Sequence, residues 1–239
     1  MNKTSIKNTF FAICFASLLI GCSNHNQEIK QFANQSKKNP IIKNIGQNRY
    51  KIGNILINKS KQSFEITGKI LRLEPPIEFL AVTKGGSRGY ESFLELDTNT
   101  FEFNLACILI GLHNHKAAPP KFQFDTTVLK GGSIEIWISW QINNKTYRFE
   151  ATNLLQLNNE KIKSKEWVYT GSGFLPDAPG GYMAEVAGGT LIGLIHAPES
   201  IIEHRFGFGN GSFKDLIIDK SIPAHVNMPI TVQIKYEGS

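Results

Sequence analysis

Short segments in which apolar and polar residues alternate make up most of the chain after residue 48. In the segment Ser133–Ile142, for example, Ile134, Ile136 and Ile138 alternate with other residues that include the polar Glu135 and Ser139. Successive side chains of a strand point to opposite faces of a sheet, so a period of two indicates half-buried strands. Extended segments are predicted over Arg49–Asn58, Ser63–Glu74, Ile77–Thr83, Tyr90–Leu96, Phe122–Leu129, Ser133–Ile142, Lys145–Glu150, Glu166–Gly171, Gly181–Ala187, Thr190–Ala197 and Pro229–Tyr236.

Glycine and asparagine mark the turns between these segments. The run Gly85–Gly89 separates Ile77–Thr83 from Tyr90–Leu96, which predicts a hairpin. The pair Asn143 and Asn144 predicts a tight turn, because asparagine tolerates the left-handed conformation that short hairpin loops require.

One segment has the period of a helix. Asn99 is a candidate N-cap, and Glu102 stands three positions later, as in a capping box. A helix is therefore predicted over Thr100–Leu112, and a short second one over Thr152–Leu157. The apolar positions of the first helix are Phe101, Leu105, Ile108, Leu109 and Leu112. The expected fold class is α+β and β-rich, with antiparallel or mixed sheets and one well-marked helix near residues 100–112.

The N-terminus is typical of an exported bacterial lipoprotein. Lys3 and Lys7 precede an uncharged, mostly apolar run at residues 9–20, which is shorter than the about 20 residues that a stable membrane span needs. The tetrapeptide Leu19–Cys22 then matches a lipobox. We expect cleavage after residue 21 and attachment of diacylglycerol to the Cys22 thiol as a thioether, with palmitate as a typical further acyl chain.

This N-terminus sets the expected organisation and location. Residues 1–21 are a signal peptide, residues 22–47 form a polar tether rich in Asn, Gln, Ser and Lys, and residues 48–239 form one globular domain. Lipidated Cys22 would anchor the chain to a membrane of the cell envelope. Ser23 stands where Asp would favour inner-membrane retention, so the periplasmic face of the outer membrane is favoured for a Gram-negative source.

Composition and charge exclude several classes of protein. Of the 239 residues, 41% are apolar and 19% charged, which is typical of a folded domain and not of a disordered chain. The net charge is +6, and the basic residues are scattered instead of clustered on one segment. No nucleic-acid partner is therefore expected.

The three cysteines have different expected fates. Cys14 leaves with the signal peptide, Cys22 is lipidated, and Cys107 remains among apolar residues as a buried thiol. This leaves no pair for an intramolecular disulfide.

Other motifs give weaker indications of chemistry. Gly85–Gly89 fits the pattern G-x-S-x-G with Ser87 at its centre, but the alternating residues that follow favour a hairpin turn over a nucleophile elbow. His113 and His115 form a His-x-His pair, yet no further ligand is identifiable, so solvated histidines are the favoured interpretation and no metal site is expected.

Two clusters of aromatic and polar residues are candidates for ligand binding. Tyr90 and Glu91 follow the glycine turn directly. Trp167, Ser172 and Tyr182 flank a segment rich in glycine and proline. Aromatic and small polar side chains in loops are common in ligand grooves.

Several segments taken together resemble a known family. They are Gly68–Leu112, with Pro-Pro-Ile-Glu-Phe-Leu and Tyr90-Glu91-Ser92, then Ile134–Trp140, Trp167–Phe174 and Tyr182–Ile195. In this order they resemble the YdjY-type domain of uncharacterised exported bacterial proteins, over about residues 50–205. Family members commonly have His-Glu-Ser where this chain has Tyr90, Glu91 and Ser92. The resemblance implies a β-rich domain and assigns no activity.

Two functions remain open from the sequence. The favoured one is an envelope lipoprotein whose globular domain binds or scaffolds an envelope protein or a small molecule, without a cofactor. The alternative is an envelope acid/base or metal-assisted hydrolase that uses Glu91 with Ser172 or a histidine. No catalytic residue is assigned. The two differ in geometry: a hydrolase needs these groups to converge on one point, whereas Glu91 paired with an arginine would be structural.

Overall fold

The computed structural model describes residues 41–113, 117, 119–173, 182–208 and 215–238. The chain divides into two compact units, Met1–Lys43 and Asn44–Ser239. Strand β1 (Ile42–Gly46) crosses this division, and the other described helices and strands belong to the second unit. The signal peptide, Cys22 and residues 23–40 of the predicted tether lie outside the described residues, and β1 lies in the part of the tether that is described.

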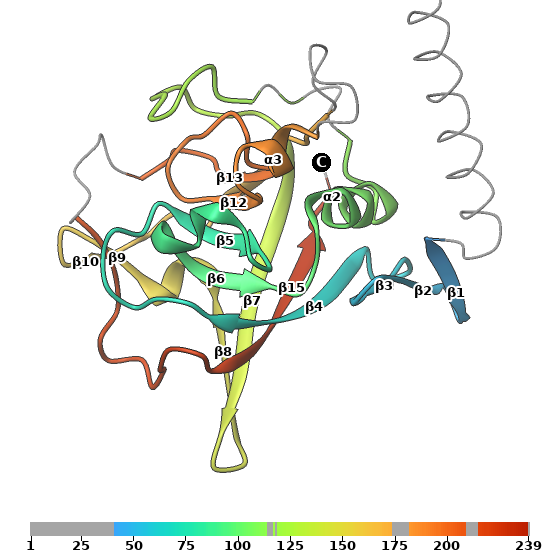
Figure 1. The fold of residues 1–239 in the computed structure, drawn as a ribbon, viewed down its shortest axis with the longest axis horizontal. Coiled ribbons are helices and arrows are strands. Elements are labelled where there is room, and N and C mark those ends of the chain that lie inside the picture. The colour runs from blue at the N-terminus through green and yellow to red at the C-terminus, as the bar shows by residue number, and fades with distance from the viewer. Residues whose placement is uncertain (1–40, 114–116, 118, 174–181, 209–214, 239) are drawn as a thin grey trace, which may run out of the picture. The chain divides into compact units, whose positions relative to one another are not determined.

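Eight strands of the second unit form a closed ring of hydrogen-bonded neighbours (Figure 1). In order around the ring they are β4 (Ser63–Ile70), β15 (Pro229–Tyr236), β7 (Gly132–Ile142), β11 (Trp167–Tyr169), β13 (Ile202–His204), β12 (Thr190–Gly193), β5 (Phe79–Thr83) and β6 (Ser92–Leu96). The ring closes where β6 pairs with β4. The pairs β5–β6 and β12–β13 are parallel and the other pairs antiparallel.

Two long strands, β4 and β7, each pair with different strands along their length. The first half of β4 pairs with β3 (Ile55–Asn58), which forms a hairpin with β2 (Arg49–Ile52), and the second half pairs with β6. Similarly, β7 pairs with β11 at its start and with β8 (Lys145–Glu150) over the rest of its length. Figure 1 shows the β7–β8 hairpin extending away from the ring. The chain also forms a small sheet from β10 (Glu160–Lys161), β9 (Leu155–Leu157) and β14 (Leu216–Ile218).

The alternating pattern of the long strands determines which face is buried. Ile134, Ile136 and Ile138 of β7 are at most 1% exposed, and the partly exposed Glu135 and Trp137 between them lie on the opposite face. By contrast, every residue of β5 is buried, as expected for a strand covered on both faces. The apolar interior therefore lies inside the ring, and a polar sheet face lies outside it.

The main helix, α2 (Thr100–Leu109), begins as its sequence predicts. The Asn99 side chain accepts a hydrogen bond from the backbone amide of Glu102 at 2.8 Å. Phe103 packs edge-to-face on Phe64 of β4, with ring centroids 5.5 Å apart. The helix ends before Leu112 because Gly111 takes a left-handed conformation with φ of +106°. No described helix has the length and apolar character to span a membrane.

The β-rich fold with a mixed sheet and one main helix is confirmed, and so is the tight turn at Asn143 and Asn144, whose φ angles are +49° and +62°. The extent of several elements was predicted wrongly. Arg49–Asn58 is two strands, and Phe122–Leu129 contains no strand. The described part of Gly181–Ala187 contains the short helix α3 (Met183–Val186), and Thr152–Leu157 is divided between a 3₁₀ turn, η3 (Ala151–Leu154), and β9.

The predicted hairpin around Gly85–Gly89 is also wrong. The two strands, β5 and β6, run parallel, with Ala81 opposite Leu94. A 3₁₀ helix, η1 (Ser87–Glu91), lies between the end of β5 and the start of β6. Gly86 allows this tight return, because a side chain there would meet Val82 at 2.5 Å and the carbonyl oxygen of Gly188 at 2.7 Å.

Candidate functional site

A cluster of charged side chains surrounds η1. The Arg88 guanidinium donates from Nη1 to Glu91 Oε1 at 2.6 Å, and its Nη2 lies 3.8 Å from Glu199 Oε1. Glu91 is only 5% exposed. The glutamate that the sequence presents as a candidate base is therefore held by an arginine three residues before it, in an ion pair that is largely removed from water.

A second buried carboxylate belongs to the same cluster. Glu78, 3% exposed, immediately precedes β5, and its backbone amide donates to the Glu91 carbonyl at 2.8 Å. Its Oε2 accepts a hydrogen bond from Gln123 at 3.1 Å. Burial, reinforced by the negative charge of Glu91, raises the pKa of Glu78 above its ordinary value, and the positive charge of Arg88 partly opposes this effect. A carboxyl with a raised pKa can exchange a proton nearer to neutral pH.

Tyr90 lies at the surface of this cluster. Its side chain is 58% exposed, and its hydroxyl accepts a hydrogen bond from Arg88 Nη1 at 3.4 Å. Tyr90 and Glu91 are therefore close in space as well as in sequence, and Arg88 contacts both. Ser87, the centre of the G-x-S-x-G pattern, is exposed at the start of η1.

Tyr182 and Ser172 belong to a different group, centred on α2. Asn104 of this helix donates to the Tyr182 hydroxyl at 2.5 Å and accepts from the Tyr169 hydroxyl at 2.7 Å. Tyr182 in turn donates to the Ser172 carbonyl at 3.2 Å, while the Ser172 hydroxyl accepts from the Ala184 amide at 3.3 Å. Burial raises the pKa of both tyrosines, so these phenols stay protonated and act as donors.

Trp167 lies in neither group. It is fully buried, and its indole N–H donates to Glu150 Oε1 at 3.1 Å. The other oxygen of Glu150 accepts from the backbone amide of Thr152 at 3.0 Å, which caps η3. Trp167 therefore joins β11 to the end of β8 inside the core.

The candidate ligand-binding residues thus occupy three places. Tyr90 and Glu91 lie at η1, Ser172 and Tyr182 lie beside α2, and Trp167 is in the core. Among the described residues, no hydrogen bond or ion pair links Glu91 to Ser172 or to a histidine. A backbone hydrogen bond connects η1 to the segment that follows α3. In it, the Arg88 amide donates to the Gly188 carbonyl at a distance of 3.4 Å.

The remaining candidates are Cys107 and the His-x-His pair. Cys107 is fully buried, and burial raises the pKa of its thiol well above the ordinary value. His113 is described and His115 is not. In the part of the chain that the structure describes, no group of three or more histidine, cysteine or acidic side chains is arranged to hold a metal ion.

A second buried polar group lies around β13. His204 is fully buried between aromatic rings, and burial lowers its pKa to about 4. The adjacent Glu203 is also fully buried, and burial raises the pKa of its carboxyl well above the ordinary value. Its Oε1 accepts from the Ala197 amide at 3.0 Å. Gly193 gives this carboxylate room, since a Cβ at that position would lie 2.3 Å from Glu203 Oε2.

His204 should make the domain sensitive to acid. A histidine whose pKa is lower in the folded state takes up a proton on unfolding, so stability falls as the pH drops from about 6.5 towards 4. Through His204 alone, we expect the free energy of unfolding to decrease by about 2 kcal/mol between pH 7 and pH 5. Urea denaturation at both pH values gives the loss of stability between pH 7 and pH 5 for the wild type and for His204→Gln. The difference between the two losses is the contribution of His204.

The comparison also removes the contributions of neighbouring groups. Glu203 titrates in the opposite sense, because a carboxyl with a raised pKa destabilises the fold as the pH rises, but it is present in both proteins. The charges of His196 and Arg205 also act on His204 and are likewise retained. His225→Gln, at an exposed position, is the control for loss of an imidazole. If the wild type and His204→Gln lost the same stability between pH 7 and pH 5, His204 would not be a source of the acid sensitivity.

Sequence reasoning missed several residues that organise these groups. Arg88 was considered only as part of a turn, and Glu78 only as part of an apolar strand. Asn104 lies within an apolar helix, where a single asparagine on the buried face is a readable sign of an internal hydrogen bond. Glu203 follows two isoleucines in a short apolar segment, and an acidic residue in such a run indicates a buried carboxylate.

Comparison with known proteins identifies the domain. No curated protein and no solved structure matches the chain. Residues 55–207 match the family described as the YdjY domain. The match covers more than half of the chain and includes η1 with its charged cluster, α2 and the buried group around β13. The chain therefore belongs to the YdjY domain family.

Proposed function

We propose that this protein is a lipoprotein of the bacterial cell envelope whose YdjY domain binds a ligand or an envelope partner. The observation that most supports the anchor is the order of elements at the N-terminus. Lys3 and Lys7, an apolar run and the lipobox Leu19–Cys22 follow one another at the spacing of an export signal. Several acyl chains on Cys22 would provide stable attachment without a membrane span. The outer membrane is the favoured location for a Gram-negative source.

The contacts of the candidate groups favour binding over catalysis. A general base must accept a proton from its substrate or from water, but the Glu91 carboxylate already receives a charged hydrogen bond from Arg88. A serine nucleophile needs a base within hydrogen-bond reach, whereas the Ser172 hydroxyl accepts from a backbone amide. Both side chains hold local structure together. A rigid ring with polar outer side chains is suited to presenting a binding surface.

Cys22→Ala should abolish lipidation. Because alanine has no thiol to form the thioether, we expect no palmitate incorporation, and either accumulation of the unprocessed chain or its release from the membrane fraction. Metabolic labelling followed by membrane fractionation measures both effects. Cys14→Ala is the matched control, because it removes a thiol from the same N-terminal segment and should leave labelling unchanged. Normal labelling of Cys22→Ala would refute the anchor.

The binding role has a separate test. Crosslinking in intact cells should recover the chain together with an envelope partner or ligand. If the domain stays alone while the purified protein turns over a substrate, the binding role is wrong and the hydrolase alternative is favoured.

A further inference from the structure

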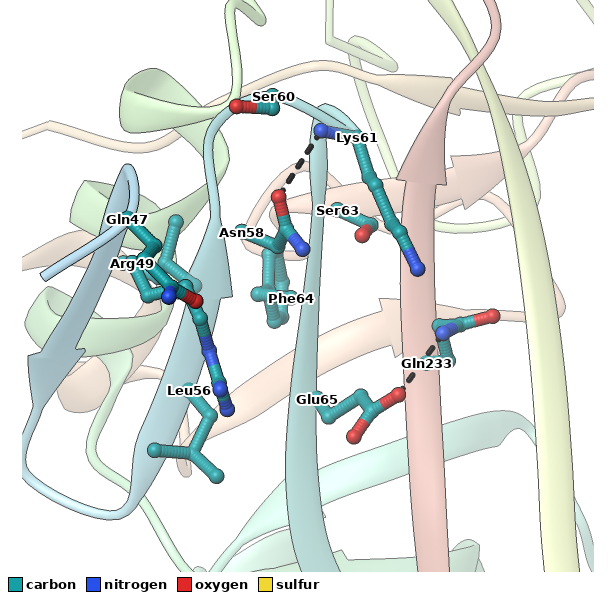
Figure 2. Close-up of a pocket in the computed structure, with 11 residues that line it drawn as sticks. Gln47, Arg49, Leu56, Asn58, Ser60, Lys61, Ser63, Phe64, Glu65 and Gln233 are labelled. Carbon is teal, nitrogen blue, oxygen red and sulfur yellow. Dashed lines mark hydrogen bonds between the residues drawn. The ribbon is translucent and has the colours of Figure 1, made fainter.

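A polar hollow lies on the outer face of the ring, away from the candidate residues at η1 and α2. It has a volume of about 450 Å³ and lies over the β2–β3 hairpin and its neighbours β4 and β15 (Figure 2). This volume is within the range of small-molecule sites. Its polar lining residues include Arg49, Asn58, Lys61, Ser63, Glu65 and Gln233.

Strand pairing places these side chains on one face. Arg49 of β2 is opposite Asn58 of β3, and Asn58 is opposite Ser63 of β4. Glu65, two residues beyond Ser63, is opposite Gln233 of β15. Directly paired residues point to the same side of a sheet, as do residues two apart along a strand. The apolar residues of its lining are Leu56, Ile57 and Phe64, and the last two are buried.

The two cations of the hollow have no counter-ion among the described residues. Neither Arg49 nor Lys61 forms an ion pair there, whereas other basic residues of the same outer face do, such as Lys235 with Glu135 at 3.1 Å. Figure 2 shows Arg49 and Lys61 on either side of Asn58 and Ser63. An arginine and a lysine beside one hollow provide a positive potential that an anion can neutralise.

Ser63 provides a third donor beside the two cations. The residue is only 6% exposed, and no hydrogen bond holds its hydroxyl within the described residues, but its oxygen is still accessible to solvent. A hydroxyl that makes no hydrogen bond to the protein can donate to a bound anion without breaking an existing bond. The Ser63 side chain lines the hollow (Figure 2). A bound group that accepts a hydrogen bond would satisfy it.

Asn58 adds a fourth donor in a fixed orientation. Its Oδ1 accepts from the Lys61 backbone amide at 3.0 Å, which holds the side-chain amide in place and leaves its NH₂ group without a partner among the described residues. The hollow therefore offers a guanidinium, an ammonium, a hydroxyl and an amide NH₂. Two cationic donors favour an anion with more than one negative charge, and the three terminal oxygens of a phosphate monoester can accept from all four groups.

We propose that this hollow binds a phosphate group, held by Arg49, Lys61, Ser63 and Asn58. Glu65 limits the affinity, because its carboxylate lines the same hollow and repels an anion, although Gln233 Nε2 donates to its Oε1 at 2.9 Å. The proposal gives a ligand class to the binding role proposed above and rests on that role alone. It does not depend on the lipid anchor, so failure of one test leaves the other unaffected.

Calorimetric titration of the full-length chain in detergent with glycerol 3-phosphate tests this site. Arg49→Gln and Lys61→Gln should each weaken binding about tenfold or more, because each removes a charged donor, and Ser63→Ala should weaken it several-fold. Glu65→Gln should strengthen binding several-fold while keeping a partner for Gln233. Since a misfolded variant cannot bind more tightly, this gain would not be mimicked by unfolding.

Lys59→Gln is the matched control, because it removes the same charge from the same hairpin at a position that does not line the hollow. Titration with glycerophosphoglycerol distinguishes the sources of the phosphate. Binding of both compounds indicates a lipid headgroup, and binding of the monoester alone indicates a free phosphate ester. Acetate should bind more weakly than either. The proposal is overturned if neither phosphate compound binds, or if Lys59→Gln weakens binding as much as Arg49→Gln.

Discussion

Arg88→Ala should destabilise the domain by about 3 kcal/mol, because it leaves the carboxylate of Glu91 buried without its partner. Glu91 is 5% exposed and receives a 2.6 Å hydrogen bond from Arg88. The substitution also removes the only guanidinium that faces Glu78 and Glu199 within the described cluster, so three carboxylates lose a compensating charge. Urea denaturation at pH 7 measures the loss as a lower midpoint.

A double-mutant cycle separates this buried pair from an ordinary surface pair. Glu91→Gln removes the charge that needs compensation, so adding it to Arg88→Ala should recover about half of the lost stability. Lys84→Ala is the control, since Lys84 pairs with Asp97 at 3.7 Å while its side chain is 72% exposed, and its loss should change stability by less than about 0.5 kcal/mol. Equal effects of the arginine and lysine substitutions would show that Arg88 does not compensate a buried charge.

The same experiments bear on the hydrolase alternative. If Arg88 and Glu91 only hold η1 between β5 and β6, their effects should appear in stability and be relieved together in the double variant. An acid/base residue behaves differently, because its conservative substitution to glutamine would abolish turnover while leaving the fold intact. The contacts of Glu91 favour the first outcome.

The elements that could be predicted from the sequence are those specified by nearby residues. The cap of α2 depends on Asn99 and Glu102, and the β7–β8 turn depends on Asn143 and Asn144. The last strand, β15, has the predicted bounds because its alternation is uninterrupted. In each case the energetic reason for the structure lies within a few residues of the chain.

The wrongly predicted elements depend on distant contacts. The segment around η1 looked like a hairpin, but the continuous burial of β5 requires neighbours on both faces, which a parallel arrangement provides. The helix α3 was predicted as a strand. In the structure, the backbone amides of Glu185 and Val186 donate to the Tyr182 carbonyl, as in a helical turn. Residues 181–187 form a short and mostly apolar run, and the period of such a run does not distinguish a helix from a strand.

The candidate site illustrates the same limit. Tyr90 and Glu91 could be selected because an aromatic and a polar residue directly follow the glycine turn, a pattern common in ligand grooves. Their grouping with Glu78 could not be predicted, because it results from the pairing of β5 with β6. The hollow over β2, β3, β4 and β15 was missed entirely, since its polar residues alternate with apolar ones like those of any half-exposed strand.

Gly68→Ala should be among the most destabilising single substitutions of the domain, with an expected loss of about 3 kcal/mol or more. Gly68 is where β4 passes from its partner β3 to its partner β6, and its register places it opposite both Ile230 and Leu96. A Cβ there would lie 2.2 Å from the Glu95 carbonyl oxygen. Backbone atoms of β6 cannot move aside without breaking the pairing that closes the ring.

Thermal and urea denaturation should therefore show a lower midpoint for Gly68→Ala, and amide exchange should increase in β6 before other strands because the closing pair opens first. Gly173→Ala is the matched control, since a Cβ there meets nothing within 4 Å and the backbone is not left-handed. That variant should be neutral or slightly more stable, because alanine restricts the unfolded chain. Similar stability of the two variants would mean that β4 and β6 can separate without cost, and the ring would then not be what holds η1 and its charged cluster in place.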